Sequence, residues 1–364
     1  MLLTATGAPY LLVPFIPLAI VLDLIGADAT PIFITSALGV VPTAALMGRA
    51  TEELASRSGP GIGGLLNVTF GNAPELIIAL FALNTGLHEV VKASLVGSII
   101  GNILLVLGAS MLAGGIGRDR QRFNATAASA QSSMLLLALV AAVMPAVFAL
   151  VNGAGLPLPG ATRRGFGHDL EVLSLITAVV LIGVYVAALI FSLRTHRDLF
   201  NPADAHEIDG DSWSTRRSML MLAVAGIAVA IMSEILVSSI TEFADSAGVS
   251  QFFIGAVIVA IVGNAAEHWV AVLVARKNQM DLAVNIAIGS SVQIALFVLP
   301  VLVLASYVLG PSPMALVFNG FELAALVLAA LIANQVTQDG ESTWFEGLQL
   351  LAVYAIVAVA FFVA

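Results

Sequence analysis

The chain of 364 residues contains no cysteine and very few charged residues. The lack of cysteine excludes disulfide bonds and thiolate metal sites. Only 10% of the residues are charged, whereas soluble domains carry about 25%. Hydrophobic residues make up 59% of the chain, and the mean hydropathy is +1.03. Too few polar residues remain to cover a soluble core, so the composition predicts an integral membrane protein in a lipid bilayer.

The charges give no indication of a macromolecular partner. The net charge of −9 is spread over short loops, and no basic stripe indicates nucleic acid. The N-terminus lacks the basic region of a cleavable signal peptide, so the first apolar segment is expected to stay. The oligomeric state is left open by the sequence.

Eleven apolar segments are long enough to cross a membrane as helices, which takes about 20 residues. The chain is therefore predicted to be an all-α polytopic membrane protein with 11 transmembrane helices. An irregular start is expected for the third segment, where the sequence reads GPGIGG. The eleven segments cover residues 9–26, 31–55, 62–84, 90–114, 124–151, 168–193, 218–241, 250–275, 280–308, 313–335 and 344–364.

The basic residues predict the orientation of the chain. With eleven spans, successive links alternate between two sides, and eleven of the 14 Lys and Arg residues fall on the side of the N-terminus. Only Lys92, Arg163 and Arg164 fall on the other side. Because basic loops stay in the cytoplasm, the N-terminus is expected to be cytoplasmic and the C-terminus external. The compact loops favour a prokaryotic plasma membrane.

A short motif occurs twice, 192 positions apart. Residues 69–83 read TFGNAPELIIALFAL, and residues 261–275 read IVGNAAEHWVAVLVA. An alignment without gaps matches the Gly-Asn-x-x-Glu of both copies and then a Gly-Ser pair. The matched positions are Gly71, Asn72, Glu75, Gly97 and Ser98 with Gly263, Asn264, Glu267, Gly289 and Ser290.

The two motifs lie in the third and eighth predicted spans, which run in opposite directions because five spans separate them. This arrangement predicts two inverted five-helix repeats, 31–193 and 218–364, after one N-terminal helix at 9–26. An acidic cytoplasmic link at 194–217 joins the repeats. Secondary transporters recurrently use such inverted repeats, with the binding site near the membrane midplane.

The duplicated acids require a function, because an ionised side chain at the bilayer centre costs about 2.5–3.5 kcal/mol. Asn72 and Glu75 share one helix face, and so do their counterparts in the second copy. Gly71 and Pro74 weaken the helix in the first copy and free backbone carbonyls, whereas the second copy has Ala266 in place of proline.

Carboxylates, amides, carbonyls and hydroxyls form an all-oxygen set of ligands. Ca²⁺ takes six to eight oxygens at about 2.3–2.6 Å, and two carboxylates neutralise its charge. Glu75 and Glu267 are therefore the predicted metal ligands, with Asn102 nearby to orient them, and the metal is a transported substrate and not a cofactor. The predicted cation site comprises Glu75, Glu267, Asn72, Asn264, Gly71, Gly263, Ser98, Ser290, Ser291 and Gln293.

The same pair of acids explains proton coupling. Burial and a second nearby carboxylate both favour protonation of the pair, which titrates as a unit. A divalent cation and protons are therefore expected to exclude each other, as an exchanger requires.

The polar candidates also have structural interpretations. Asn72 and Asn264 would equally bridge helices, and the serines and Gln293 would simply pack. Glu52 and Glu234 lie near the ends of spans, where they either reach water or carry protons. His268 is assigned to the proton pathway as a neighbour of the second acid, because a lone histidine makes a poor zinc site.

GNAPELIIALFAL and GNAAEHWVAV, with GSSVQIALFV after the second copy, resemble the signature repeats of the calcium/cation–proton exchangers. This is the CAX branch of the calcium/cation antiporter superfamily, and the similarity covers the second to eleventh spans. The resemblance implies alternating access by two sliding helices and a central cation site on the two motif acids. It also implies that Glu52 or Glu53 and Glu234 pass protons or ions from the cytoplasmic side. The acidic segment 204–211 resembles a short version of one found in the family.

The sequence thus predicts a Ca²⁺/H⁺ antiporter, a transporter and not an enzyme, that moves Ca²⁺ out of the cytoplasm. Exchange of sodium for calcium, or of another divalent cation, on the same fold is the alternative. Sodium-coupled relatives carry a hydroxyl residue where Asn72 and Asn264 stand, which favours protons here. An intramembrane hydrolase or metalloenzyme would need paired aspartates or His-x-x-x-His in a span, and the sequence has neither. Two inverted halves disfavour a channel.

Overall fold

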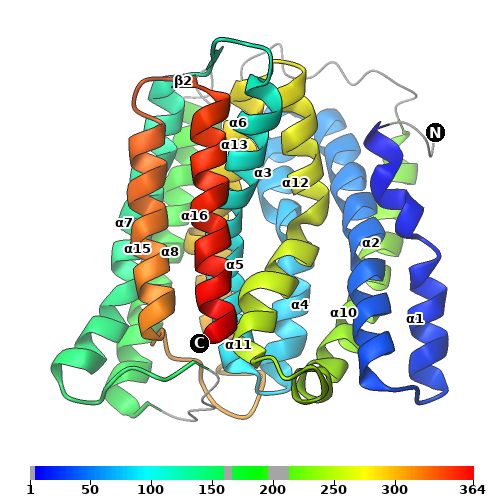
Figure 1. Cartoon of the computed structure of the whole chain (residues 1–364), viewed down its shortest axis with the longest axis vertical. Helices are drawn as coiled ribbons and strands as arrows, with labels where there is room; N and C mark the ends of the chain where they lie inside the picture. The colour runs from blue at the N-terminus through cyan, green and yellow to red at the C-terminus, as the bar shows by residue number, and fades with distance from the viewer. Residues whose placement is uncertain (1–4, 160–165, 196–212) are drawn as a thin grey trace.

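The computed structural model describes residues 5–159, 166–195 and 213–364. Most of these residues are helical, and the long helices run side by side along one axis (Figure 1). The N-terminus and the C-terminus lie at opposite ends of this axis (Figure 1). The acidic segment 204–211, together with Arg163 and Arg164, lies outside the described residues.

The first part of the chain supplies the helices up to residue 195. A 3₁₀ helix, η1, precedes α1, and two stretches, η2 and η3, are π-helical. The elements are η1 (Ala5–Leu12), α1 (Phe15–Leu24), α2 (Ala29–Arg57), α3 (Gly59–Gly71), α4 (Ala73–Asn84), α5 (His88–Ile100), η2 (Gly101–Val106), α6 (Leu107–Gly115), α7 (Ala125–Val151), α8 (His168–Ile190) and η3 (Phe191–Thr195).

The second part contains two further π-helical stretches, η5 and η6. A two-residue strand in each part, β1 (Gln121–Arg122) and β2 (Glu341–Ser342), pairs antiparallel. The helices are α10 (Thr215–Ala247), α11 (Gln251–Phe253), η5 (Ile254–Val259), α12 (Ala260–Arg276), α13 (Met280–Gln293), η6 (Ile294–Val298), α14 (Leu299–Ala305), α15 (Gly320–Val336) and α16 (Trp344–Val363).

The helices agree with a polytopic membrane protein. In the described part of the chain, nine helical stretches are long and apolar enough to cross a membrane. The pair α3 and α4, bent by 44°, makes a tenth if it is one span. The apolar helix α15 is shorter than the others. The predicted all-α membrane fold is confirmed, whereas the count of eleven spans stays a prediction that requires both the bent pair and α15 to cross.

The predicted span at 313–335 is wrong at its beginning, because α15 starts only at Gly320. Asn319 and Glu322 form a capping box that fixes this start. Residues 313–319 are not helical, although most of them are fully buried. Hydrophobicity therefore extended the predicted helix into a buried stretch of non-helical chain.

Side chains of other elements hydrogen-bond to the backbone of this non-helical stretch. Non-helical backbone at membrane depth is tolerated only where it is buried in protein and has such partners. The three bonds are Met314 N–H to Ser306 Oγ (2.8 Å), Leu316 N–H to Ser174 Oγ (2.9 Å) and Lys92 Nζ to Val317 O (2.7 Å).

Helix boundaries recur at the same spacing as the duplicated motif. The starts of α5 and α13, the starts of α6 and α14, and the ends of α4 and α12 are each 192 positions apart. Gly86, with a φ of 79°, corresponds to Asn278, with a φ of 64°. Asn278 is the one non-glycine among the described residues with positive φ. Two distant segments therefore share their local structure as well as their motif.

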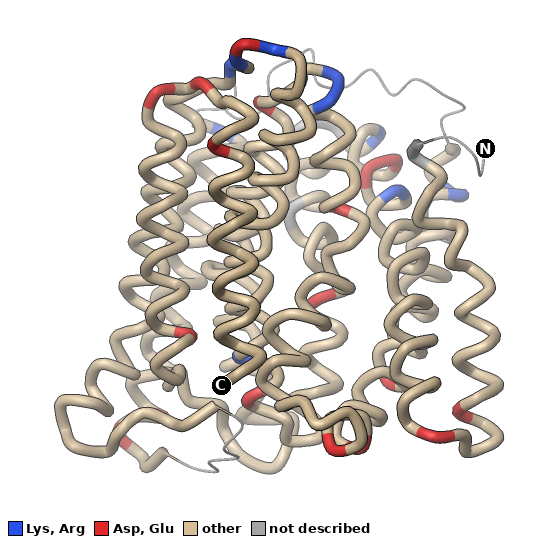
Figure 2. The backbone as a smooth tube through the Cα atoms, viewed as in Figure 1, with Lys and Arg blue, Asp and Glu red and all other residues tan. Residues whose placement is uncertain are grey.

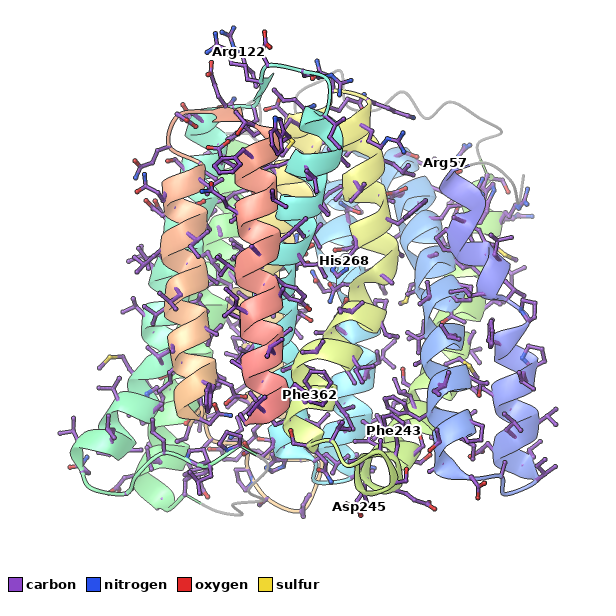
Figure 3. All side chains as sticks on the ribbon, viewed as in Figure 1. Arg57, Arg122, Phe243, Asp245, His268 and Phe362 are labelled. Atoms are coloured by element: carbon purple, nitrogen blue, oxygen red, sulfur yellow. The ribbon has the colours of Figure 1, made fainter. Side chains whose placement is uncertain are left out.

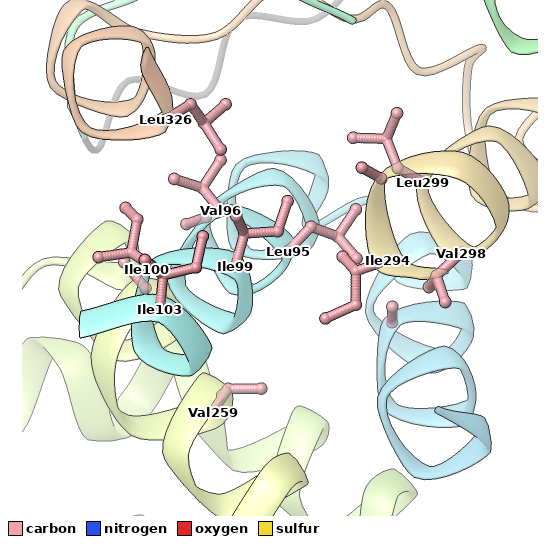
Figure 4. Close-up of a cluster of buried hydrophobic side chains, with 14 of the residues drawn as sticks. Leu95, Val96, Ile99, Ile100, Ile103, Val259, Ile294, Val298, Leu299 and Leu326 are labelled. Atoms are coloured by element: carbon pink, nitrogen blue, oxygen red, sulfur yellow. The ribbon is translucent and has the colours of Figure 1, made fainter. Parts of the chain in front are cut away.

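The buried core surrounds α5 and the start of η2. Leu95, Val96, Ile99 and Ile100 of α5 are fully buried and contact residues of η5, η6 and α15 (Figure 4). Gly97 permits the closest approach, since a Cβ atom there would lie 1.9 Å from the carbonyl oxygen of Ala256. The central helices thus form a tightly packed frame.

Basic residues gather at the end of the bundle that carries the N-terminus, here named the basic face (Figure 2). Arg120 and Arg122 form ion pairs with Glu341 at 2.7 and 3.2 Å across the β1–β2 pair. These arginines lower the pKa of Glu341, chiefly through the hydrogen bond from Arg120. The basic face follows the distribution that the sequence predicted for the cytoplasmic side.

Candidate cation site

The first motif lies at a break between two helices. Asn72 separates α3 from α4, and Pro74 stands in the first turn of α4 together with Glu75. Proline cannot donate a backbone hydrogen bond, and it is tolerated at this first turn. The second motif lies inside the continuous helix α12, which has Ala266 at the position of the proline. The sequence predicted this difference between the two copies.

The two acids meet across the motif glycines. A Cβ atom built on Gly71 would lie 3.6 Å from Oε1 of Glu267. A Cβ atom built on Gly263 would lie 3.5 Å from Oε1 of Glu75. Each glycine therefore provides the space that the acid of the other motif occupies.

Three hydrogen bonds connect the predicted site residues across helices. Asn72 Nδ2 donates to Gln293 Oε1 (2.5 Å), and Asn264 Nδ2 donates to Ser98 Oγ (2.9 Å). Ser290 Oγ donates to Glu267 Oε2 at 2.7 Å. The structure thus assembles α3, α4, α5, α12 and α13 around one polar centre. Glu75, Asn72 and Asn264 are buried there, whereas Glu267 is half-buried.

Three oxygens at this centre lack a hydrogen-bond donor among the described residues. They are Asn72 Oδ1, Glu75 Oε2 and Asn264 Oδ1, and all three are buried. The side-chain N–H groups of both asparagines donate hydrogen bonds to neighbouring residues. Their side-chain oxygens therefore remain available to a ligand. An unsatisfied buried polar atom costs about 1–3 kcal/mol, which a bound cation would remove. The arrangement suits a hard cation.

Acids alone do not complete the site. Within the described ranges, no group of three or more His, Cys, Asp or Glu side chains converges. A cation bound here would take further ligands from amide and hydroxyl oxygens, as the sequence predicted for a Ca²⁺ site.

Two predicted residues make other contacts. Ser291 Oγ donates to the carbonyl oxygen of Ala287 at 2.9 Å, which fits its structural interpretation. His268 lies midway along the bundle (Figure 3), and its Nε2 lies 3.3 Å from Oδ1 of Asn102. His268 thus contacts the asparagine on η2, whereas the sequence suggested the adjacent acid.

The other acids of the predicted proton pathway differ in their surroundings. Glu52 of α2 is exposed, and its charge acts on Glu267. Glu234 of α10 is also exposed. Glu53 is buried, and its Oε2 accepts a hydrogen bond from the backbone N–H of Trp213 at 2.9 Å. Of the two adjacent acids on α2, Glu53 is therefore held by a hydrogen bond, and Glu52 is the exposed one.

Sequence reasoning missed the role of Trp213. The guanidinium groups of Arg49 and Arg217 each lie 4.8 Å from its ring centroid. Together with the bond to Glu53, these contacts fasten the beginning of α10 to α2. Arg217, four residues after Trp213, was the available signal, but Arg49 and Glu53 are distant in sequence.

The chain matches known proteins along almost its whole length. Residues 29–194 and 217–363 match the sodium/calcium exchanger protein family. The Ca(2+)/H(+) antiporter ChaA of Bacillus subtilis is 45% identical over 352 residues, covering 95% of this chain and 96% of the relative. A Ca(2+)/H(+) antiporter of Aphanothece halophytica is 43% identical over 366 residues, covering 96% and 94%.

A solved structure supports the same relation. Native YfkE superimposes with a TM-score of 0.83 at 41% identity, covering 98% of this chain and all of that one. The relatives named above are antiporters, which confirms the prediction of a transporter and not an enzyme. The resemblance noted in the sequence is confirmed, and the chain belongs to the sodium/calcium exchanger protein family.

Proposed function

We propose that the protein exchanges cytoplasmic Ca²⁺ for external H⁺ by alternating access, in a prokaryotic plasma membrane. Two relatives of nearly equal length are named Ca(2+)/H(+) antiporters, which supports both ions. The observation that carries the proposal is the meeting of two carboxylates with two asparagine oxygens, where Glu75 Oε2 and both asparagine oxygens are buried and unpaired.

Competition between the two cargoes follows from charge. Glu75 and Glu267 together neutralise Ca²⁺, whose oxygen ligands would include Asn72 and Asn264. When the cation leaves, two closely spaced carboxylates repel each other in a medium of low dielectric constant. Protons remove this repulsion and make the empty site neutral. Return of the protonated site and displacement of the protons by Ca²⁺ complete the cycle.

The two halves of the chain would provide the alternating access. The matched helix boundaries support two inverted five-helix repeats after an N-terminal helix. Helices α2 and α10 pack along each other, with Phe33 and Phe243 stacked at 4.0 Å. With α1, they lie together at one side of the bundle (Figure 1). We infer that this pair slides against the remaining helices.

The exposures support a site that opens toward the basic face. Glu267 is half-buried and Glu52 is exposed, whereas Glu75 is buried. The basic face would be cytoplasmic, because short basic loops are retained there. The N-terminus would then be cytoplasmic and the C-terminus external.

Flux measurements on purified protein in proteoliposomes test the proposal. An imposed pH gradient is expected to drive Ca²⁺ uptake, and added Ca²⁺ is expected to release protons. A sodium gradient at constant pH on both sides is expected to drive none. Sodium-driven Ca²⁺ flux would instead establish sodium/calcium exchange, and a panel of divalent cations would define selectivity.

The glycine at the second motif offers a prediction about affinity. Gly263→Ala places a methyl group 3.4 Å from Cγ of Glu75, which is ordinary contact but occupies the space beside the carboxylate. We expect Ca²⁺ to bind about tenfold more weakly, corresponding to about 1.4 kcal/mol. Thermal stabilisation by Ca²⁺ measures this effect. Gly183→Ala on α8, where a Cβ meets nothing within 4 Å, is the control. Equal affinities in both variants would contradict the prediction.

A further inference from the structure

A small cavity adjoins Glu75 on the side away from the basic face. It lies between α4, α5 and η5. Its lining residues are Glu75, Ile78, Ser94, Leu95, Ser98 and Val259. Ser94 was not among the residues that the sequence singled out, and the Ca²⁺ site described above does not use it.

The position of the cavity follows from the directions of the helices. Ile78 comes about one turn after Glu75 on α4, and Ser94 comes about one turn before Ser98 on α5. Val259 comes about one turn before Gly263. Because α4 runs opposite to the other two elements, all three steps lead toward the same face. The cavity therefore extends from the cation site toward the face opposite the basic one.

The chemistry of the lining is specific. Oε1 of Glu75 lies toward Gly263, whereas Oε2 is buried and has no donor among the described residues. The hydroxyl of Ser94 donates to the carbonyl oxygen of Val91 at 2.9 Å, which leaves its oxygen lone pairs available. The hydroxyl oxygen of Ser98 accepts from Asn264. A carboxylate and two hydroxyls thus face the space, and the rest of the lining is apolar.

These groups suit water and not Ca²⁺. Three side chains cannot supply the six to eight oxygens that Ca²⁺ takes. A buried water, in contrast, needs two to four polar partners and little room. A water here would donate one hydrogen to Glu75 Oε2 and the other to Ser94 Oγ.

We propose that this cavity is an outer proton port in which Ser94 positions a water beside Glu75. A hydronium ion reaching the cavity transfers one proton to Oε2 of Glu75 and leaves a neutral water. The inference rests on the proposed exchange of Ca²⁺ for H⁺. It separates the route of the proton from that of the cation and makes Ser94 a positioning residue.

The charged surroundings of Glu75 fit this role. The titratable group that acts on it is Glu267 of α12. The lining from α5 and η5 is neutral. Glu52 on α2 and Glu234 on α10 are exposed acids of the helices that pack nearby. No described basic group lines the cavity, so nothing there repels an incoming proton.

Substitutions at Ser94 test the port in everted membrane vesicles, whose lumen corresponds to the outer side. Ser94→Val fills the cavity and removes the hydroxyl, Ser94→Ala removes the hydroxyl alone, and Ser94→Thr keeps it. We expect Ser94→Val to slow proton-driven Ca²⁺ uptake about tenfold or more, most strongly when the lumen is least acidic. Ser94→Ala should be intermediate with a larger solvent isotope effect, and Ser94→Thr should restore the wild-type pH profile.

Thr177→Val on α8 is the matched control. Thr177 is buried, and its hydroxyl donates to the carbonyl oxygen of Leu173 in its own helix at 2.8 Å, as Ser94 does to Val91. Thermal stabilisation of each purified variant by Ca²⁺ is measured in parallel and should not change. A wild-type rate and pH profile in Ser94→Val would overturn the port. Loss of Ca²⁺ stabilisation in that variant would overturn it too, since Ser94 would then support the cation site. Absence of proton-driven uptake by the wild type would refute the proposed function instead.

Discussion

Glu75→Gln is expected to abolish proton-driven Ca²⁺ uptake. The amide keeps the shape of the side chain but removes a charge that Ca²⁺ requires and a group that a proton can occupy. Loss of one partner from a buried charged contact costs about 2–5 kcal/mol, so Ca²⁺ affinity should fall about 30-fold to several thousand-fold. Glu267→Gln should behave similarly, because each acid lies against the glycine of the other motif. Flux in proteoliposomes and Ca²⁺-dependent thermal stabilisation measure the two effects.

The folded state should tolerate both substitutions. Removing one of two facing acids relieves their repulsion, so the melting temperature without Ca²⁺ should stay the same or rise. Glu341→Gln, on the basic face between Arg120 and Arg122, is the control and should transport normally. Retention of pH-driven Ca²⁺ uptake by Glu75→Gln would refute the assignment of this acid.

Lys92→Met should cause the largest loss of stability. Lys92 is 1% exposed, and its ammonium group lies 2.6 Å from Oε1 of Glu89 and 2.7 Å from the carbonyl oxygen of Val317. Its charge also acts on the buried Glu322 of α15. The substitution leaves buried acids without a counter-charge and the carbonyl oxygen of Val317 without its donor. Removing one partner of a buried ion pair costs about 3–5 kcal/mol.

A double substitution separates the lost charge pair from the lost packing. Lys92→Met combined with Glu89→Leu replaces the pair by apolar side chains, which is often tolerated, and should recover part of the stability. Thermal unfolding of the purified protein in detergent measures both variants. If the double variant were no more stable than Lys92→Met alone, the unpaired Glu89 would not be the cause.

Much of the fold was predictable because the bilayer restricts the possible backbone structures. Long apolar segments must be helical in lipid, so most of the helices follow from hydrophobicity. The stretch 313–319 could not be distinguished from a helix in this way. Its conformation depends on Lys92, Ser174 and Ser306, which are distant in sequence and reach it only in the folded protein.

The centre of the site was predictable from the duplicated motif, but its surroundings were not. Two acids in equivalent apolar segments indicate a common function, and the structure places Glu75 and Glu267 near each other. The contacts of His268 and Ser94 depend on which side of a helix faces inward. Short π-helical stretches such as η2 and η5 change that rotation locally, and no sequence period reveals them.

The reciprocal placement of the motif glycines has an evolutionary consequence. Each segment holds the recess for the other segment's carboxylate, so a lone ancestral copy would have had an acid without a recess to receive it. If the two segments are inverted repeats of one ancestral copy, that copy would have needed a second chain in the opposite orientation to complete the site. After the two copies fused into one chain, a change of the transported ion would have required substitutions in both motifs.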